Sequence, residues 1–136
     1  LGLDPGYRRL FVDYLRDYAR SENKTVFLTS HIIQDMERLI DDCIIMDYGS
    51  ILIQQPIEKL MKGLRKYTCT VPEGYQPQLP VTCYHPAVIR QTLETYSFLP
   101  PSDVEGLLKE NQVPFTGLQH ENVSLEDAFI GLTGKY

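Results

Sequence analysis

Cysteine is scarce in this chain of 136 residues, and basic residues are scarce in its second half. The three cysteines, Cys43, Cys69 and Cys83, are odd in number and form no Cys-x-x-Cys pair. We therefore expect reduced, structural thiols and neither a disulfide framework nor a zinc site. Residues 67–136 carry three Lys/Arg and eight Asp/Glu, whereas residues 1–66 carry ten of each. Because nucleic acids and anionic lipids require clustered positive charge, we expect no nucleic-acid partner for the second half.

Long apolar runs and targeting signals are also missing. No apolar run approaches the roughly 18 residues of a membrane span, and no basic and apolar segment with a cleavage site opens the chain. The composition, 43% hydrophobic and 23% charged, is typical of a globular protein. We expect a cytoplasmic chain with one ordinary domain or two small ones.

A phosphate-binding glycine loop is absent. Such a loop needs glycines before a helix, with Lys and Ser/Thr at fixed offsets. The Gly134-Lys135 pair is followed by Tyr136 instead of Ser/Thr, and Phe129 stands where the first loop glycine belongs. The sequence therefore predicts that this chain alone neither binds nor hydrolyses ATP.

The first part of the chain predicts an α/β layer. Asp4 and Pro5 are a suitable N-cap and first residue for a helix over residues 6–20. Its apolar stripe is expected to pack inward, with the polar residues outward. The stripe comprises Leu10, Phe11, Tyr14, Leu15 and Tyr18, and the tyrosines Tyr7, Tyr14 and Tyr18 are expected to pack.

Further elements follow in this part. Residues 25–29 form an apolar, β-branched run without alternation, which predicts a strand buried on both faces, and His31 comes directly after it. We expect a helix over 32–40, a buried strand over 43–46, a hairpin through Gly49 into 51–53, and a short helix from Pro56 to Met61.

The second part has a different texture and predicts a small α+β accessory domain, with a ferredoxin-like arrangement as one candidate. Ser102, with Glu105 three residues later, is expected to cap one helix. Ser124 is expected to cap the last helix and Gly134 to end it. The expected strands are 67–71, 81–84, 95–99 and 115–120, and the expected helices are 87–93, 102–111 and 124–133.

Two segments at the right separation resemble motifs of ABC transporter ATPases. Leu1-Gly2-Leu3-Asp4-Pro5 resembles the D-loop, and Thr29-Ser30-His31, with the helix, strand and glycine turn after it, resembles the switch histidine region. The resemblance covers residues 1–62 closely. It implies that His31 contacts the γ-phosphate of ATP and that Asp4 acts across a dimer interface. The Walker A, signature and Walker B motifs are absent, and the resemblance implies that they precede Leu1.

The closing segment, 123–134, resembles ATPase subunits of exporters whose membrane domain is a separate ABC-2 type polypeptide, such as multidrug efflux systems. The resemblance implies a C-terminal piece of a P-loop ATPase domain in residues 1–62 and an accessory domain in residues 63–136. It implies a parent that binds ATP and Mg, forms a homodimer, joins an integral-membrane permease and lies at the inner face of the cell membrane.

Simpler interpretations stand beside these. An aspartate before a helix stabilises it by about 1 kcal/mol whatever the function, and a histidine at a strand end is often only structural. His85 and His120 lack partners at metal-ligand spacing, so no metal site is predicted. The alternative function is a non-enzymatic regulatory or interaction module that contacts a partner subunit. In either case the expected strands over 25–29 and 43–46 have edges with unpaired backbone groups. We therefore expect the isolated chain to self-associate.

Overall fold

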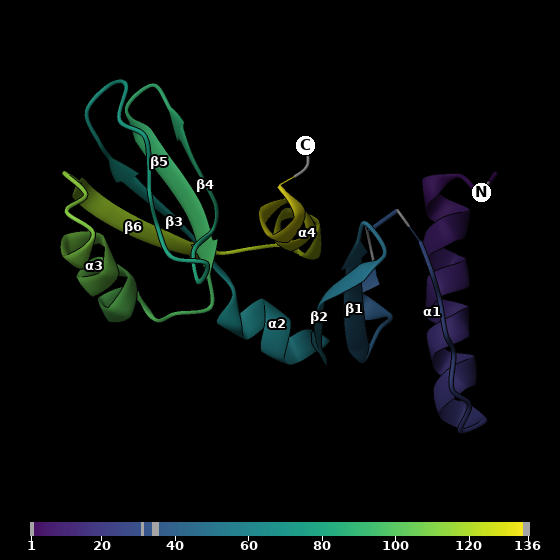
Figure 1. The fold of residues 1–136 in the computed structure, drawn as a ribbon. Helices are drawn as coiled ribbons and strands as arrows, with labels where there is room; N and C mark the ends of the chain where they lie inside the picture. The colour runs from purple at the N-terminus through teal and green to yellow at the C-terminus, as the bar shows by residue number, and fades with distance from the viewer. Residues whose placement is uncertain (1, 31, 34–35, 135–136) are drawn as a thin grey trace.

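The protein consists of a four-stranded sheet with its helices, a β-hairpin, and a long N-terminal helix (Figure 1). The computed structural model describes residues 2–30, 32–33 and 36–134. The elements in order are α1 (Pro5–Ser21), the one-turn 3-10 helix η1 (Met36–Arg38), β1 (Asp42–Asp47), β2 (Ser50–Pro56), α2 (Ile57–Gly63), β3 (Arg65–Thr70), β4 (Tyr84–Ile89), β5 (Thr92–Ser97), α3 (Pro101–Glu110), β6 (Thr116–Asn122) and α4 (Leu125–Thr133).

The four-stranded sheet is antiparallel with the strand order β4-β5-β3-β6. Side chains alternate between its faces, so Cys69 and its cross-strand partner Leu93 share one face. Helix α3 covers this face with Val104 and Leu108. We call the resulting cluster the sheet core; it comprises Tyr67, Cys69, Val71, Leu93, Val104, Leu108 and Val113.

The opposite face of the sheet is partly charged and partly covered. Lys66 lies 3.5 Å from Glu94 and 3.8 Å from Glu121 on the neighbouring strands. Tyr96 on the same face packs against α4. A second cluster forms here, which we call the junction core because it joins the sheet to the hairpin. It comprises Cys43, Ile45, Leu60, Leu64, Tyr96, Val123, Leu125, Ala128 and Leu132.

The predicted hairpin is confirmed, but its burial differs from the prediction. Strands β1 and β2 pair antiparallel across a two-residue turn in which Tyr48 and Gly49 have φ values of 46° and 76°. Positive φ at both positions is the geometry of a type I′ turn, which Gly49 favours. Burial in β1 alternates, with Cys43 and Ile45 buried and Ile44 and Met46 exposed. The expectation of a buried strand over residues 43–46 was therefore only half right, because Ile44 and Met46 are 42% and 57% exposed.

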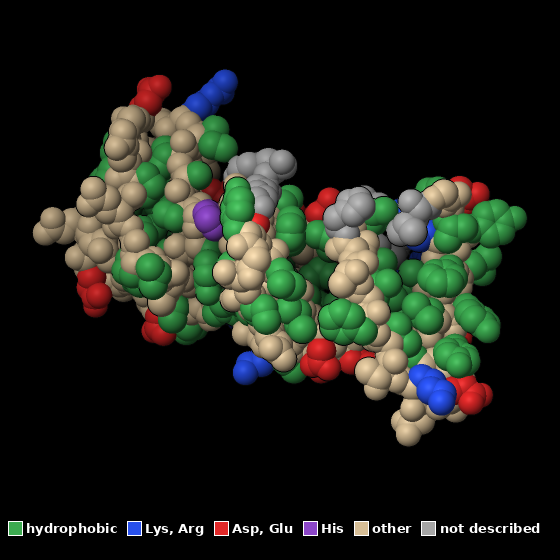
Figure 2. Space-filling view, turned by 45° about the vertical axis from the view of Figure 1, so that its right-hand side comes forward, with side chains coloured by type: hydrophobic (Ala, Val, Ile, Leu, Met, Phe, Trp, Pro, Cys, Tyr) green, Lys and Arg blue, Asp and Glu red, His purple; other side chains and the backbone are tan. Residues whose placement is uncertain are grey.

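Helix α1 has the predicted cap but the opposite orientation. Most of its apolar stripe lies in solvent, where Leu10, Phe11 and Tyr14 are 65%, 52% and 68% exposed, whereas Leu15 is half-buried. Val12, on the other side of the helix, is buried instead. The expectation that this stripe and Tyr7, Tyr14 and Tyr18 pack inward was therefore wrong for all of these residues except Leu15. Figure 2 shows the exposed hydrophobic side chains along the outer side of the helix.

Residues 25–29 do not form the predicted strand. They run extended alongside α1 with no strand partner in the described part of the chain, and Phe27 is 82% exposed (Figure 1). A strand requires a neighbour for its backbone groups, which an apolar run by itself does not supply. Of the helix expected over 32–40, the structure has the single turn η1; residues 34 and 35 lie outside the described residues.

Most of the elements predicted for the C-terminal part are present, with shifted bounds. The strands expected over 67–71, 95–99 and 115–120 correspond to β3, β5 and β6, and the helices expected over 102–111 and 124–133 correspond to α3 and α4. Some other predictions for this part need correction. Residues 87–93 are not a helix but the hairpin of β4 and β5, whose turn places Arg90 at φ 58°. The strand expected over 81–84 begins only at Tyr84. Ser102 does not cap α3, because Pro100 is the N-cap and Pro101 the first helical residue. Ser124 does cap α4, and Gly134 ends it in the left-handed conformation.

The fold is thus mixed α/β with antiparallel sheets. The connection from β3 to β4, residues 71–83, contains no helix, whereas α3 connects β5 to β6. Among the described residues, no helix has both the length and the apolar character needed to cross a membrane.

Candidate functional site

Asp4 lies at the exposed N-terminus of α1. Its carboxylate oxygen Oδ1 accepts a hydrogen bond from the backbone N–H of Tyr7 at 3.0 Å, and its carbonyl accepts one from Arg8 at 2.9 Å. This is the N-cap geometry that the Asp-Pro pair predicts. The cap uses the oxygen Oδ1 and Asp4 is exposed, so the cap and a role at an interface are compatible.

His31 lies outside the described residues. Of the described residues on either side, the hydroxyl of Ser30 accepts a hydrogen bond from the Ile32 N–H at 2.9 Å and is 3.2 Å from the Ile32 carbonyl oxygen, to which it donates. The segment 24–30 returns along α1 toward the end of the helix that Asp4 caps (Figure 1). The roles of His31 and Asp4 remain predictions.

An open, mainly apolar cavity of about 900 Å³ lies between α1, the segment 24–33 and β1. Among the described residues, at this cavity or elsewhere, no group of His, Cys, Asp and Glu could hold a metal ion. The apolar lining of the cavity includes Leu15, Ala19, Val26, Leu28, Met36 and Phe129.

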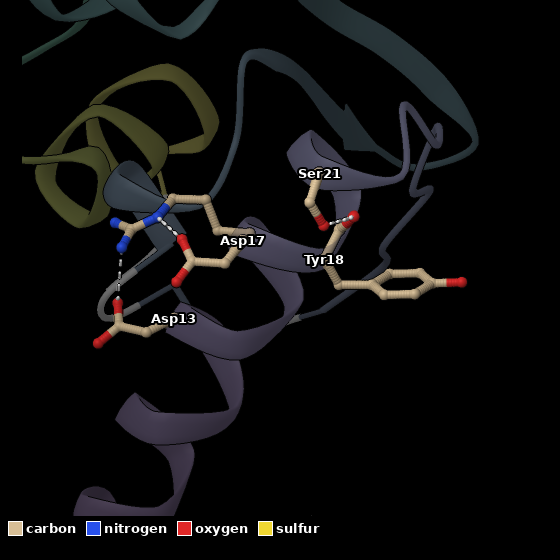
Figure 3. Close-up of polar contacts among 5 residues, drawn as sticks. Asp13, Asp17, Tyr18 and Ser21 are labelled. Carbon is tan, nitrogen blue, oxygen red and sulfur yellow. Dashed lines mark hydrogen bonds and ion pairs between the residues drawn. The ribbon is translucent and has the colours of Figure 1, made fainter.

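The charged side chains that line this cavity are Arg16, Arg20, Lys24, Asp41 and Asp42, and Arg16 forms ion pairs within its own helix. Arg16 on α1 lies 3.5 Å from carboxylate oxygens of both Asp13 and Asp17 (Figure 3). Exposed pairs of this kind stabilise a protein by at most about 1 kcal/mol. The same view shows the Tyr18 ring directed away from the helix, while the Tyr18 carbonyl accepts a hydrogen bond from Ser21. Arg16 is therefore paired with two carboxylates of its own helix, while Arg20 and Lys24 are further basic side chains in the lining of the cavity.

Sequence reasoning missed Glu37. Its carboxylate accepts a hydrogen bond from the backbone N–H of Leu125, the first residue of α4 and 88 positions away. No local pattern could have indicated a contact at that separation. It connects the segment after His31 with the last helix.

The three thiols are buried in the fold. Cys43, Cys69 and Cys83 are free and buried, and burial raises the pKa of each thiol. Burial likewise raises the pKa of Tyr67, whose hydroxyl donates to the Leu99 carbonyl at 2.6 Å. A nucleophilic cysteine needs a lowered pKa, so none of these thiols fits that role.

Comparison with known proteins identifies the relatives of the chain. No protein-family model matches it. The Nod factor export ATP-binding protein I of Ralstonia nicotianae is 32% identical over 144 residues, which cover 98% of this chain and 44% of that protein. The protein of the same name from Rhizobium sp. (strain N33) is also 32% identical, over 143 residues. The Energy-coupling factor transporter ATP-binding protein EcfA2 of Staphylococcus aureus is 37% identical over 65 residues, 48% of this chain and 23% of that protein.

The chain belongs to the family of ABC transporter ATP-binding proteins. It spans less than half the length of the relatives it matches over nearly its whole length, and the match lies in their C-terminal half. The resemblance of the Asp4 and His31 segments to this family is thereby confirmed at the level of the family.

Proposed function

We propose that the chain is the C-terminal part of the ATP-binding subunit of an ABC exporter, which couples ATP hydrolysis to export across the membrane. The observation that carries the proposal is the match along 98% of the chain to proteins whose names specify export and ATP binding. The closing segment 123–134, with its resemblance to subunits of ABC-2 type exporters, supports the choice of an exporter. Multidrug efflux is the proposed type of transport.

The parent binds ATP with Mg, and His31 and Asp4 belong to its nucleotide site. His31 would contact the γ-phosphate, and Asp4 would act across the interface of two subunits. The capped, exposed position of Asp4 is compatible with this role. The isolated chain lacks a glycine loop and is proposed to be inactive by itself.

Replacement of His31 in the longer parent tests the assignment. His31→Ala should lower the rate of ATP hydrolysis by on the order of a hundredfold, the scale for removing a positioned polar group at developing charge. His120→Ala, which removes an exposed histidine of β6, is the matched control and should retain full activity. Near-normal hydrolysis by the His31 variant would refute the role of His31.

A side-by-side assay of the two proteins tests the function itself. The parent should hydrolyse ATP, and the 136-residue chain should not. ATP hydrolysis by the isolated chain would contradict its proposed inactivity. A parent without ATPase activity would favour the alternative, a regulatory or interaction module that contacts a partner subunit.

The proposed partners are a second ATP-binding subunit and an integral-membrane permease, which would hold the parent at the inner face of the cell membrane. The domain limits, 1–62 for the ATPase piece and 63–136 for the accessory domain, are also proposals. For the accessory domain we propose a ferredoxin-like relationship, which the strand order and the crossover helix α3 support.

The apolar face of α1 and the side chain of Phe27 are exposed. This exposure supports the proposal that the rest of the ATPase domain covers them in the parent. Without that cover the isolated chain should self-associate, which light scattering over a range of concentrations measures. Leu10→Lys with Tyr14→Lys should reduce the association. The control, Val81→Lys with Ile89→Lys, alters two exposed side chains of the other region and should leave it unchanged. A monomer at all concentrations would contradict self-association.

A further inference from the structure

The N-terminus of α4 is held by two acceptors from different parts of the chain. The hydroxyl of Ser124, its own N-cap, accepts a hydrogen bond from the Asp127 N–H at 3.1 Å. The carboxylate of Glu37, in the turn η1, accepts one from the N–H of Leu125. The first turn of a helix has free N–H groups that a local cap cannot all satisfy, and a carboxylate is favoured there by the helix dipole. Glu37 therefore acts as a second cap supplied from a distance.

Apolar contacts surround this hydrogen bond. Ile33, Met36 and Ile40 pack against the junction core, and Phe129 of α4 packs there too. The hydrogen bond of the Leu125 N–H is partly buried. An N–H group that is removed from water needs an acceptor in the protein, because an unsatisfied donor destabilises the fold. The turn η1 is three residues long, and Glu37 and these apolar side chains connect it to α4 and the junction core.

The rest of α4 is attached to the four-stranded sheet. His85 Nε2 lies 3.1 Å from the carbonyl oxygen of Leu132, within hydrogen-bond distance. Gly131 lies so close to the Tyr96 ring that an added Cβ would be 2.4 Å from a ring carbon. Helix α4 thus contacts the sheet along its C-terminal half and the segment after His31 at its N-terminus (Figure 1).

We propose that Glu37 is a positioning residue that fixes residues 36–45 against α4, so that the C-terminal sheet determines where the segment following His31 is held. The contact itself is a property of this chain. Its consequence for ATP hydrolysis rests on the proposed function. Glu37 would act on the reaction only through the segment that it positions.

Amide hydrogen exchange of the 136-residue chain tests the contact and the coupling together. Glu37→Ala should speed exchange about tenfold at Leu125, because the N–H loses its acceptor, and also along β1, because residues 36–45 lose their attachment. Glu37→Gln keeps a carbonyl acceptor and should restore most of the protection at both places.

The matched control is Ser124→Ala, which removes the other cap of the same helix. It should speed exchange at Asp127 and leave β1 unchanged. Unchanged exchange at Leu125 in Glu37→Ala would disprove the contact. Faster exchange at Leu125 alone, with β1 unaffected, would disprove the coupling.

The longer parent supplies an independent measurement. Glu37→Ala should lower kcat for ATP hydrolysis about five- to tenfold with little change in the KM for ATP, and Glu37→Gln should restore it, whereas Ser124→Ala should have little effect. A parent that hydrolyses ATP with an unchanged kcat in Glu37→Ala overturns the positioning role. A parent without ATPase activity overturns the proposed function instead, and the exchange measurement still decides the coupling.

Discussion

The two ends of the chain use their hydrophobic residues in opposite ways. In residues 57–134 the apolar side chains meet in the sheet core and most of the junction core. Among the described residues of 2–56, only Val12, Cys43 and Ile45 are buried hydrophobics. All the strongly exposed large hydrophobics of the described chain lie in this first region, except Val81 and Ile89.

This difference distinguishes a region that completes its own core from one that does not. The four-stranded antiparallel sheet pairs its strands with one another, and α3 covers one of its faces from within the same region. The apolar stripe of α1 and the run over 25–29 have the composition of buried elements, yet the described chain offers nothing to cover them. Apolar residues in a repeated pattern thus indicate an interface without indicating which part of a protein supplies the other side.

The largest difference between the regions should appear when the same side chain is shortened in each. Leu60→Ala empties a fully buried position of the junction core and should lower the free energy of unfolding by about 2–5 kcal/mol. Leu10→Ala, at a position 65% exposed on α1, should change it by less than about 0.5 kcal/mol. Urea denaturation below the concentration of self-association measures both. Equal losses would show that the face of α1 is covered in solution.

A pair of glycines sharpens the comparison within the packed region. Gly131→Ala places a methyl group into the Tyr96 ring and should destabilise the protein by about 1–3 kcal/mol. Gly106→Ala in α3 meets nothing within 4 Å and should stabilise the protein by about 0.5–1 kcal/mol, because alanine is the better helix former. Thermal unfolding of both variants measures the effects. Destabilisation of the same size at both positions would contradict the tight contact between α4 and β5.

Local chemistry made part of this fold predictable. Asp4 and Ser124 cap their helices because a short polar side chain before a helix satisfies its first N–H groups wherever it occurs. Gly49 predicted the hairpin turn for an equally local reason. The Asp-Pro and Thr-Ser-His segments indicated the family because their spacing is carried by the sequence itself.

Contacts between distant residues were not predictable. The helical stripe of α1 was recognised, but the side that faces the protein depends on partners elsewhere in the chain. Residues 87–93 form a hairpin around the turn at Arg90 and not a helix. The hairpin is favoured because its second strand, β5, also pairs with the distant strand β3. The contact of Glu37 with Leu125 spans 88 positions and left no pattern to detect.

The smallest effect concerns the thiols, and it appears only in alkali. Burial raises the pKa of Cys43, Cys69 and Cys83 above an ordinary value of about 9.0. Each thiol ionises less readily in the folded protein than in the unfolded chain. Below the pKa of the unfolded chain this difference has no effect on the free energy of unfolding. As the pH rises from that pKa through the higher pKa of the folded protein, the free energy of unfolding decreases. The free energy of unfolding should therefore fall above about pH 9, as urea denaturation at successive pH values would measure. A constant value up to pH 10 would contradict the raised pKa of these groups.

The rates of thiol modification then separate the two regions. Cys43 lies in β1, which pairs only with β2, whereas Cys69 lies in β3, which is paired on both sides. A reagent reaches a buried thiol through local opening, and a two-stranded sheet opens more readily than a central strand. At pH 8 we expect Cys43 to react several-fold faster than Cys69, and both far slower than in the unfolded chain. Equal rates for the two thiols would mean that they are exposed by one global opening, and that the hairpin and the sheet unfold as a single unit through the junction core.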